Sequence, residues 1–159
     1  MILPDVMKRD LKVVFCGTAA GTKSALLGAY YAGPGNTFWA TLDEIGLTPS
    51  QLRPDQYANL LDYGIGLTDL SKLAHGSDRE VGTGGFDVDG LTAKLERFAP
   101  GCVAFNGKNA ANGALRRPVD YGEQPECLGP ARVFVLPSTS GAARKSWDVR
   151  YWHELAKLV

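Results

Sequence analysis

The chain has 159 residues, a length that suits one domain with a single hydrophobic core, so we expect one domain over residues 1–159. Its 45% hydrophobic content is ordinary for a soluble globular protein, and no apolar run approaches the ~20 residues that a membrane-spanning helix needs. The formal net charge is zero, which argues mildly against nucleic-acid binding, because phosphate contacts require Lys or Arg. A balanced total can still conceal a basic face, for which the last third of the chain offers Arg116, Arg117, Arg144, Lys145 and Arg150.

Hydrophobic spacing predicts an alternation of strands and helices. The apolar run at residues 11–16 is ended by Gly17, which is typical of a buried strand. Residues 37–45 have apolar side chains at helical spacing, with Asn36 and Gly46 suited to the N-terminal and C-terminal caps. In chain order we predict a strand at residues 11–16, helices at 24–27, 37–45 and 48–61, a strand at 63–70, a helix at 91–98, a strand at 102–105, a helix at 109–115, a strand at 132–136 and a helix at 147–158. Residues 75–90 and 116–128 are expected to be loops.

This alternation predicts a three-layer α/β/α fold with a mainly parallel central sheet. In such sheets, ligands bind outside the carboxyl ends of the strands. Three loops of small and hydroxyl residues follow predicted strand ends, at residues 17–21, 68–71 and 137–143. Their joint placement predicts a binding site at that edge of the sheet.

The candidate residues in these loops each allow a structural and a functional interpretation. The loop at 17–21 lacks the spacing of a Walker or dinucleotide loop, so it is either a tight turn or a set of backbone donors for a carbonyl or phosphate. Asp69, at the end of a glycine-broken strand, either caps a turn or faces the site, where burial would raise its pKa. Asp87 and Asp89 are expected to be helix caps or solvated loop charges. The loop at 137–143 is either a turn into the last helix or a set of donors beside Arg144, a chemistry that suits a DNA phosphate.

The aromatic residues and the cysteines give less evidence about function than the loops do. Phe38 and Trp39 are expected in the core, whereas a tyrosine of the Tyr30–Tyr31 pair is a candidate platform for a flipped base. The three cysteines are interpreted as buried free thiols in a reducing cytoplasm, since neither they nor the two histidines have the spacing of a metal site. The N-terminus alternates charged and apolar residues, unlike a signal peptide, so we expect a cytoplasmic protein.

Five stretches together resemble the mismatch-specific uracil-DNA glycosylase and thymine-DNA glycosylase family, within the uracil-DNA glycosylase superfamily. They read VVFCGTAAG at 13–21, YYAGPGNTFW at 30–39, LLDYGIGLTDL at 60–70, KLERFAPGCVAFNGK at 94–108 and VLPSTSGAAR at 135–144. The resemblance covers nearly the whole chain and implies a uracil-DNA glycosylase-like fold. It also implies double-stranded DNA with uracil or a mismatch as the partner, a monomer, and no metal or cofactor.

The resemblance assigns roles to individual positions. It implies that Gly17, Thr18, Ala19, Tyr31 and Asn36 bind the base, with Tyr31 stacking on it. It implies that Ser138 and Ser140 hold the sugar–phosphate, that Gly141, Ala142 and Ala143 form a wedge entering the base stack, and that Arg144 follows into the groove.

Two departures from the family pattern bear on the chemistry. The family's first motif reads Gly-Ile-Asn-Pro-Gly, and its asparagine positions the attacking water, whereas this chain has Ala19 there. Asp69 falls on a position that lines the base pocket, where relatives carry a neutral or basic side chain. We therefore hypothesise that Asp69 is the catalytic residue, either acting on water or stabilising the positive charge that develops on the sugar, with Asp87 as the second choice.

The resulting functional prediction is a monofunctional glycosylase that flips uracil, and other mispaired or damaged pyrimidines, out of DNA and hydrolyses the N-glycosidic bond. No lysine is placed convincingly as a Schiff-base nucleophile, so strand cleavage is not expected. The alternatives are a non-catalytic binder of damaged DNA, which the missing asparagine favours, and a nucleotide-binding enzyme using the loop at 17–21. The second alternative would need a phosphate-binding lysine or a ribose-binding acid, and neither is found.

Overall fold

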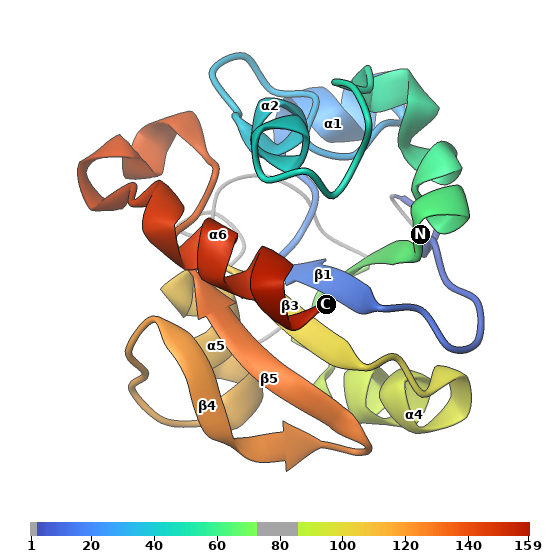
Figure 1. Ribbon diagram of the computed structural model, residues 1–159, viewed down its shortest axis with the longest axis vertical. Helices are drawn as coiled ribbons and strands as arrows, with labels where there is room; N and C mark the ends of the chain where they lie inside the picture. Colours follow the sequence, from blue (N-terminus) through green and yellow to red (C-terminus); the bar gives the residue numbers. More distant parts are fainter. Residues whose placement is uncertain (1–2, 73–85) are drawn as a thin grey trace.

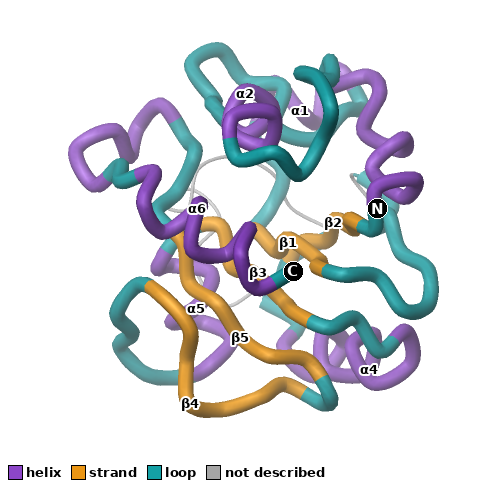
Figure 2. The backbone as a smooth tube through the Cα atoms, viewed as in Figure 1, coloured by secondary structure: helices purple, strands orange, loops and turns teal. Residues whose placement is uncertain are grey.

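A computed structural model describes residues 3–72 and 86–159 of the chain. Its centre is a five-stranded sheet with the strand order β2-β1-β3-β5-β4, and helices lie on both faces of it (Figures 1 and 2). The strands are β1 (Val13–Gly17), β2 (Ile65–Asp69), β3 (Cys102–Asn106), β4 (Gly122–Leu128) and β5 (Ala131–Leu136). The helices are α1 (Thr22–Leu27), α2 (Phe38–Glu44), η1 (Pro54–Tyr63), α4 (Val88–Phe98), α5 (Lys108–Leu115), η2 (Gly141–Ser146) and α6 (Val149–Leu158), of which η1 and η2 are 3₁₀ helices.

Four of the five strands are parallel, and only the edge strand β4 runs antiparallel, against β5. The prediction of a three-layer fold with a mainly parallel sheet is therefore confirmed. The parallel strands β2, β1, β3 and β5 all end at the same edge of the sheet, so the segments that follow them meet there. Within the described residues, none of the helices has the length and apolar character needed to cross a membrane.

Alternating side chains of the strands build a hydrophobic core on each face of the sheet. On one face Phe15 packs with Phe38 of α2 and Trp152 of α6, the ring centroids of Phe15 and Trp152 being 5.5 Å apart. On the other face Cys16 belongs to a cluster with α4 and the alanines of α5. The period-2 alternation of a strand buried on both sides thus accounts for the continuous apolar run of β1.

The N-terminal segment adds a short antiparallel pairing to the outer edge of β2. Val6 and Leu67 each donate a backbone hydrogen bond to the other, both at 2.9 Å, and Leu3 is buried. Residues 3–6 are therefore fixed beside the strand that ends at Asp69.

Several local predictions need correction. The predicted loop at 116–128 contains β4, and the predicted helix at 48–61 is the 3₁₀ helix η1, which begins only at Pro54 because proline suits the first turn of a helix. The last helix begins at Val149 rather than 147, with Asp148 as its cap. Cys127 lies exposed in β4, so only Cys16 and Cys102 are the buried thiols that we expected. Of the predicted loop at 75–90, residues 75–85 lie outside the described part of the chain, and α4 already begins at Val88.

Candidate active site

A cavity of about 670 Å³ opens at the carboxyl edge of the sheet. Its wall is formed by the ends of β1, β2 and β3, the aromatic segment before α2, and the loop after β5. The loops predicted at residues 17–21 and 137–143 both contribute to this wall, whereas the predicted loop at 68–71 contributes Asp69. The structure thus brings together most of the predicted site residues: Gly17, Thr18, Ala19, Tyr31, Asn36, Asp69, Ser138, Ser140, Gly141, Ala142 and Ala143.

Asp69 is the last residue of β2, and its carboxylate lies in the cavity wall with only 6% of the residue exposed. Of the two readings of Asp69, the structure thus favours the one that faces the site. One carboxylate oxygen, Oδ2, accepts a hydrogen bond from Lys72 Nζ at 3.2 Å. The other, Oδ1, lies toward Gly17 and the Tyr31 hydroxyl. Burial raises the pKa of Asp69, and the charge of Lys72 opposes that rise.

Tyr31 closes the cavity on the side of α2. Its ring stacks on Phe38, with the ring centroids 4.1 Å apart and the planes 27° from parallel. Its hydroxyl oxygen is buried, and among the described residues Asn106 is the side chain close enough to interact with it, although no well-formed hydrogen bond joins the two. The backbone of Tyr31 has φ of 52°, a left-handed conformation that costs a non-glycine residue about 1–3 kcal/mol and is concentrated at functional sites. Tyr31 therefore places a buried hydroxyl in the wall of the cavity.

Asn36 lines the cavity, but its side chain has a structural partner. Its Oδ1 accepts a hydrogen bond from the backbone N–H of Phe38 at 3.0 Å, but the N-cap of α2 is Thr37 rather than Asn36 as we expected, so Asn36 supports the helix start from one residue further back. The helix itself begins at Phe38, one residue later than predicted. Asn36 thus helps to fix the start of α2, the helix that follows the segment containing Tyr31.

Asn106, at the end of β3, is a cavity residue that our sequence reasoning missed. Its amide donates to Thr139 Oγ1 at 3.0 Å, and its Oδ1 accepts from the backbone N–H of Thr139 at 3.0 Å. Thr139 is buried and its carbonyl accepts from the backbone N–H of Thr37. Asn106 therefore fixes the loop after β5 against the sheet. The sequence signal that could have revealed this role is a polar residue at the end of an otherwise apolar strand, directly before Gly107.

The hydroxyls of Ser138 and Ser140 shape the loop after β5. Ser138 Oγ accepts from the backbone N–H of Ser140 at 3.1 Å, and Ser140 Oγ accepts from the backbone N–H of Ala142 at 3.3 Å. The loop then continues into η2, where Ala142 is exposed at the mouth of the cavity. The residues predicted to hold the sugar–phosphate and those predicted to form the wedge therefore follow one another along one side of the cavity mouth.

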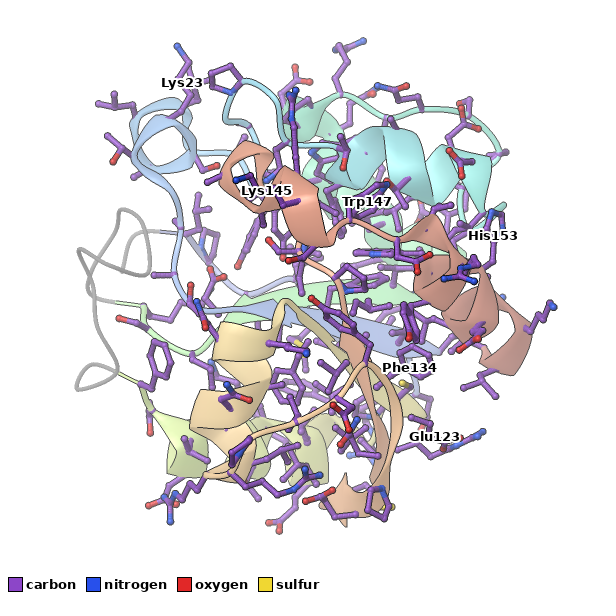
Figure 3. All side chains as sticks on the ribbon, turned by 90° about the vertical axis from the view of Figure 1, so that its left-hand side faces the viewer. Lys23, Glu123, Phe134, Lys145, Trp147 and His153 are labelled. Atoms are coloured by element: carbon purple, nitrogen blue, oxygen red, sulfur yellow. The ribbon has the colours of Figure 1, made fainter. Side chains whose placement is uncertain are left out.

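Basic residues lie in the lining of the cavity and beside it along the chain. Among the described residues, Asp69 and Lys108 are the charged residues of the lining, and exposed Lys23, Arg144 and Lys145 neighbour lining residues along the chain. Arg144 reaches across to Gly35. Figure 3 shows Lys23 and Lys145 in the same upper part of the molecule, whereas Glu123 lies in the lower part. The rim is thus suited to an anionic partner.

Other charged residues considered earlier lie elsewhere. Arg117 pairs with Glu126, and Arg150 pairs with Asp148, so these two arginines do not extend the basic rim. Asp87 caps α4 by accepting from the backbone N–H of Gly90 at 2.9 Å, and neither Asp87 nor Asp89 lines the cavity. Asp87, the second candidate for the catalytic acid, is therefore a helix cap. In residues 3–72 and 86–159, no cluster of His, Cys, Asp or Glu is arranged to hold a metal ion.

Comparison with known proteins agrees with this geometry. Residues 4–156 match the profile of the Uracil DNA glycosylase superfamily, so the chain belongs to that superfamily. The solution NMR structure of a candidate uracil DNA glycosylase from Methanosarcina acetivorans superposes with a TM-score of 0.63 at 21% identity, covering 98% of this chain and 94% of that one. That likeness shows the shared fold, and the superfamily supports hydrolytic DNA glycosylase activity.

Proposed function

We propose that this protein is a monofunctional DNA glycosylase that excises uracil, and other mispaired or damaged pyrimidines, from double-stranded DNA. The observation that carries the proposal is a buried carboxylate, Asp69, in the wall of a cavity whose mouth is basic. A carboxylate in such a site stabilises positive charge far better than it would in water. Cleavage of a glycosidic bond is a reaction in which that charge develops on the sugar.

The rim residues account for the capture of DNA. Lys23, Arg144 and Lys145 would contact phosphates, and the Gly141–Ala143 segment would enter the stack as the target nucleotide turns into the cavity. This extrusion costs a few kcal/mol and costs least at a mismatch. Tyr31 would contact the base, and its buried hydroxyl could donate a hydrogen bond to a base carbonyl.

Bond cleavage follows from the position of Asp69. The C1′–N bond breaks and its electron pair leaves with the base, while the Asp69 anion stabilises the oxocarbenium-like sugar. Water then adds to C1′ and releases its proton to solvent, and the base takes up a proton. Ala19 brings only a methyl group to the place where relatives hold water with an amide, so the main catalytic contribution falls to the carboxylate.

A non-catalytic binder of damaged DNA is the second candidate, because Ala19 replaces the family's water-holding asparagine. An excision panel separates the two functions. Duplexes and single strands carrying uracil, thymine or an ethenobase, each opposite different bases, are incubated with the protein, and free base and abasic sites are quantified. We expect free uracil from a G:U duplex without strand cleavage. Affinity for the same duplex with no base released from any substrate would favour the binder.

A further inference from the structure

Asp69 belongs to a cluster of buried and half-buried charges that lies behind the cavity wall. The cluster contains Asp5 from the N-terminal segment, Asp69 and Lys72 around the end of β2, and Lys94 from α4. Lys72 and Lys94 both contact Asp5, at 3.1 Å and 2.7 Å. Two cations therefore balance two anions, so the Asp69 carboxylate is buried together with compensating charge.

The ammonium group of Lys72 has three partners within this cluster. Nζ donates to the Tyr30 hydroxyl at 2.7 Å and to Asp69 Oδ2 at 3.2 Å, and it lies 3.1 Å from Asp5 Oδ1. The Tyr30 hydroxyl in turn donates to the carbonyl of Pro4 at 2.9 Å. The side chain of Lys72 is only 13% exposed. Its position is therefore fixed by three partners from different segments, and it fixes one oxygen of Asp69.

Asp5 is held independently of Lys72. Its Oδ1 accepts from the Thr68 hydroxyl at 2.7 Å, and Lys94 contacts its Oδ2. Burial alone would raise the pKa of Asp5, but the hydrogen bonds from Lys94 and Thr68, together with the charges of Lys72 and Lys94, outweigh burial and the pKa is lowered. Asp5 thus favours its ionised form, and it contacts Lys72 independently of Asp69.

We propose that Lys72 is a positioning residue for Asp69: its ammonium group, between the two aspartates, holds Oδ2 so that Oδ1 is presented to the cavity. This inference rests on the proposed function in assigning Oδ1 to the reacting sugar. Lys72 itself is not among the residues that line the cavity, so it acts on a substrate only through Asp69. The N-terminal segment takes part through Asp5, which ties a region distant in sequence to the catalytic carboxylate.

The cluster also sets the ionisation of Asp69. Burial raises the pKa of Asp69, Lys72 and Lys94 lower it, and Asp5 raises it. Among the described residues, the other titratable groups facing it are Tyr30, Tyr31 and Cys16, and burial raises the pKa of each of these, so all three are neutral near pH 7. Removing Lys72 or Asp5 should therefore move the titration of Asp69 in opposite directions.

Carbon-13 NMR titration of the Asp69 carboxyl group tests this directly, without substrate, using D69N to assign the signal. We expect the midpoint to move to higher pH in K72M, to return toward the parental value in K72R, and to move to lower pH in D5N. A K72M midpoint equal to the parental one, or displacement of K72M and D5N in the same direction, would overturn the proposal. If K72M does not fold, K72Q replaces it: a midpoint at higher pH supports the proposal and an unchanged one contradicts it.

Single-turnover excision provides the functional readout. In K72M we expect the acid limb of the rate profile to move to higher pH and the rate at neutral pH to fall several-fold, while the Kd for uracil-containing DNA changes by less than about twofold. A purely structural role would lower the melting temperature and leave the acid limb in place, which would contradict the proposal. If the parental protein excises no base, the proposed function fails, whereas the NMR midpoints still decide the role of Lys72.

Discussion

Gly17 and Asp69 stand opposite each other in the register of β1 and β2, at the carboxyl ends of both strands. A Cβ atom built on Gly17 would lie 3.0 Å from Asp69 Oδ1 and 3.5 Å from the Tyr31 hydroxyl. The absence of a side chain at Gly17 therefore gives the carboxylate its access to the cavity.

Replacing Gly17 by alanine should impair excision more than stability. The added methyl group is closer to Oδ1 than ordinary van der Waals contact allows, so it should displace the carboxylate, and we expect the single-turnover rate to fall at least about tenfold. G33A is the matched control, because a Cβ atom there meets nothing within 4 Å. A smaller loss in G17A than in G33A would contradict this account of the site. Thermal unfolding of both variants shows whether the fold is retained.

Asp69→Asn should stabilise the protein at neutral pH while it reduces activity. Because the folded-state pKa of Asp69 is raised above its ordinary value of 3.8, the native protein holds this proton more tightly than the unfolded chain does. Ionising Asp69 therefore costs stability as pH rises from about 3.8 through the folded-state pKa. The difference in free energy of unfolding between D69N and the parent, measured by urea unfolding, should grow over that pH range. A parent that is the more stable protein at pH 7 would contradict this prediction.

The basic rim should contribute to DNA binding through phosphates. We expect R144Q to weaken binding of any duplex and to reduce the slope of log K against log salt by about one. R150Q is the control, because Arg150 is also exposed but pairs with Asp148, and neither of these residues lines the cavity. Fluorescence anisotropy over a range of salt concentrations measures both slopes, and equal slopes for the two variants would argue against phosphate contact by Arg144.

Restoring the family's asparagine tests the interpretation of the first loop. Ala19 lines the cavity, so Ala19→Asn introduces an amide that can hold water. We expect excision of uracil to be unchanged or faster, as measured under single-turnover conditions. Complete loss of activity in a variant with parental circular dichroism would show that the loop works differently.

The layered fold and the cavity could be predicted from the sequence because buried parallel strands leave a strong local signal. Val13–Gly17 is apolar throughout, and small-residue loops follow the strand ends. β4 was missed because it is an edge strand with alternating exposed residues, and Pro125 lies where its register with β5 shifts. An edge strand of this kind is stabilised by pairing with the neighbouring strand, so it leaves little hydrophobic pattern in the sequence.

The charges that surround the Asp69–Lys72 pair could not be predicted for a different reason. Asp5 and Lys94 are far from Asp69 in the sequence, and each reads locally as a solvated charge. Only the pairing of Val6 with Leu67 and the packing of α4 bring them together. Long-range electrostatic clusters of this kind leave no local pattern.

The central claim is that the Asp69 carboxylate provides the catalytic contribution. The most direct test compares single-turnover excision from a G:U duplex by the parent, D69N, D69A and the control D89N, which changes an exposed acid outside the cavity. We predict that D69N and D69A lose about 10²–10³-fold in rate and that D89N matches the parent. Parental rates in both Asp69 variants would contradict the account.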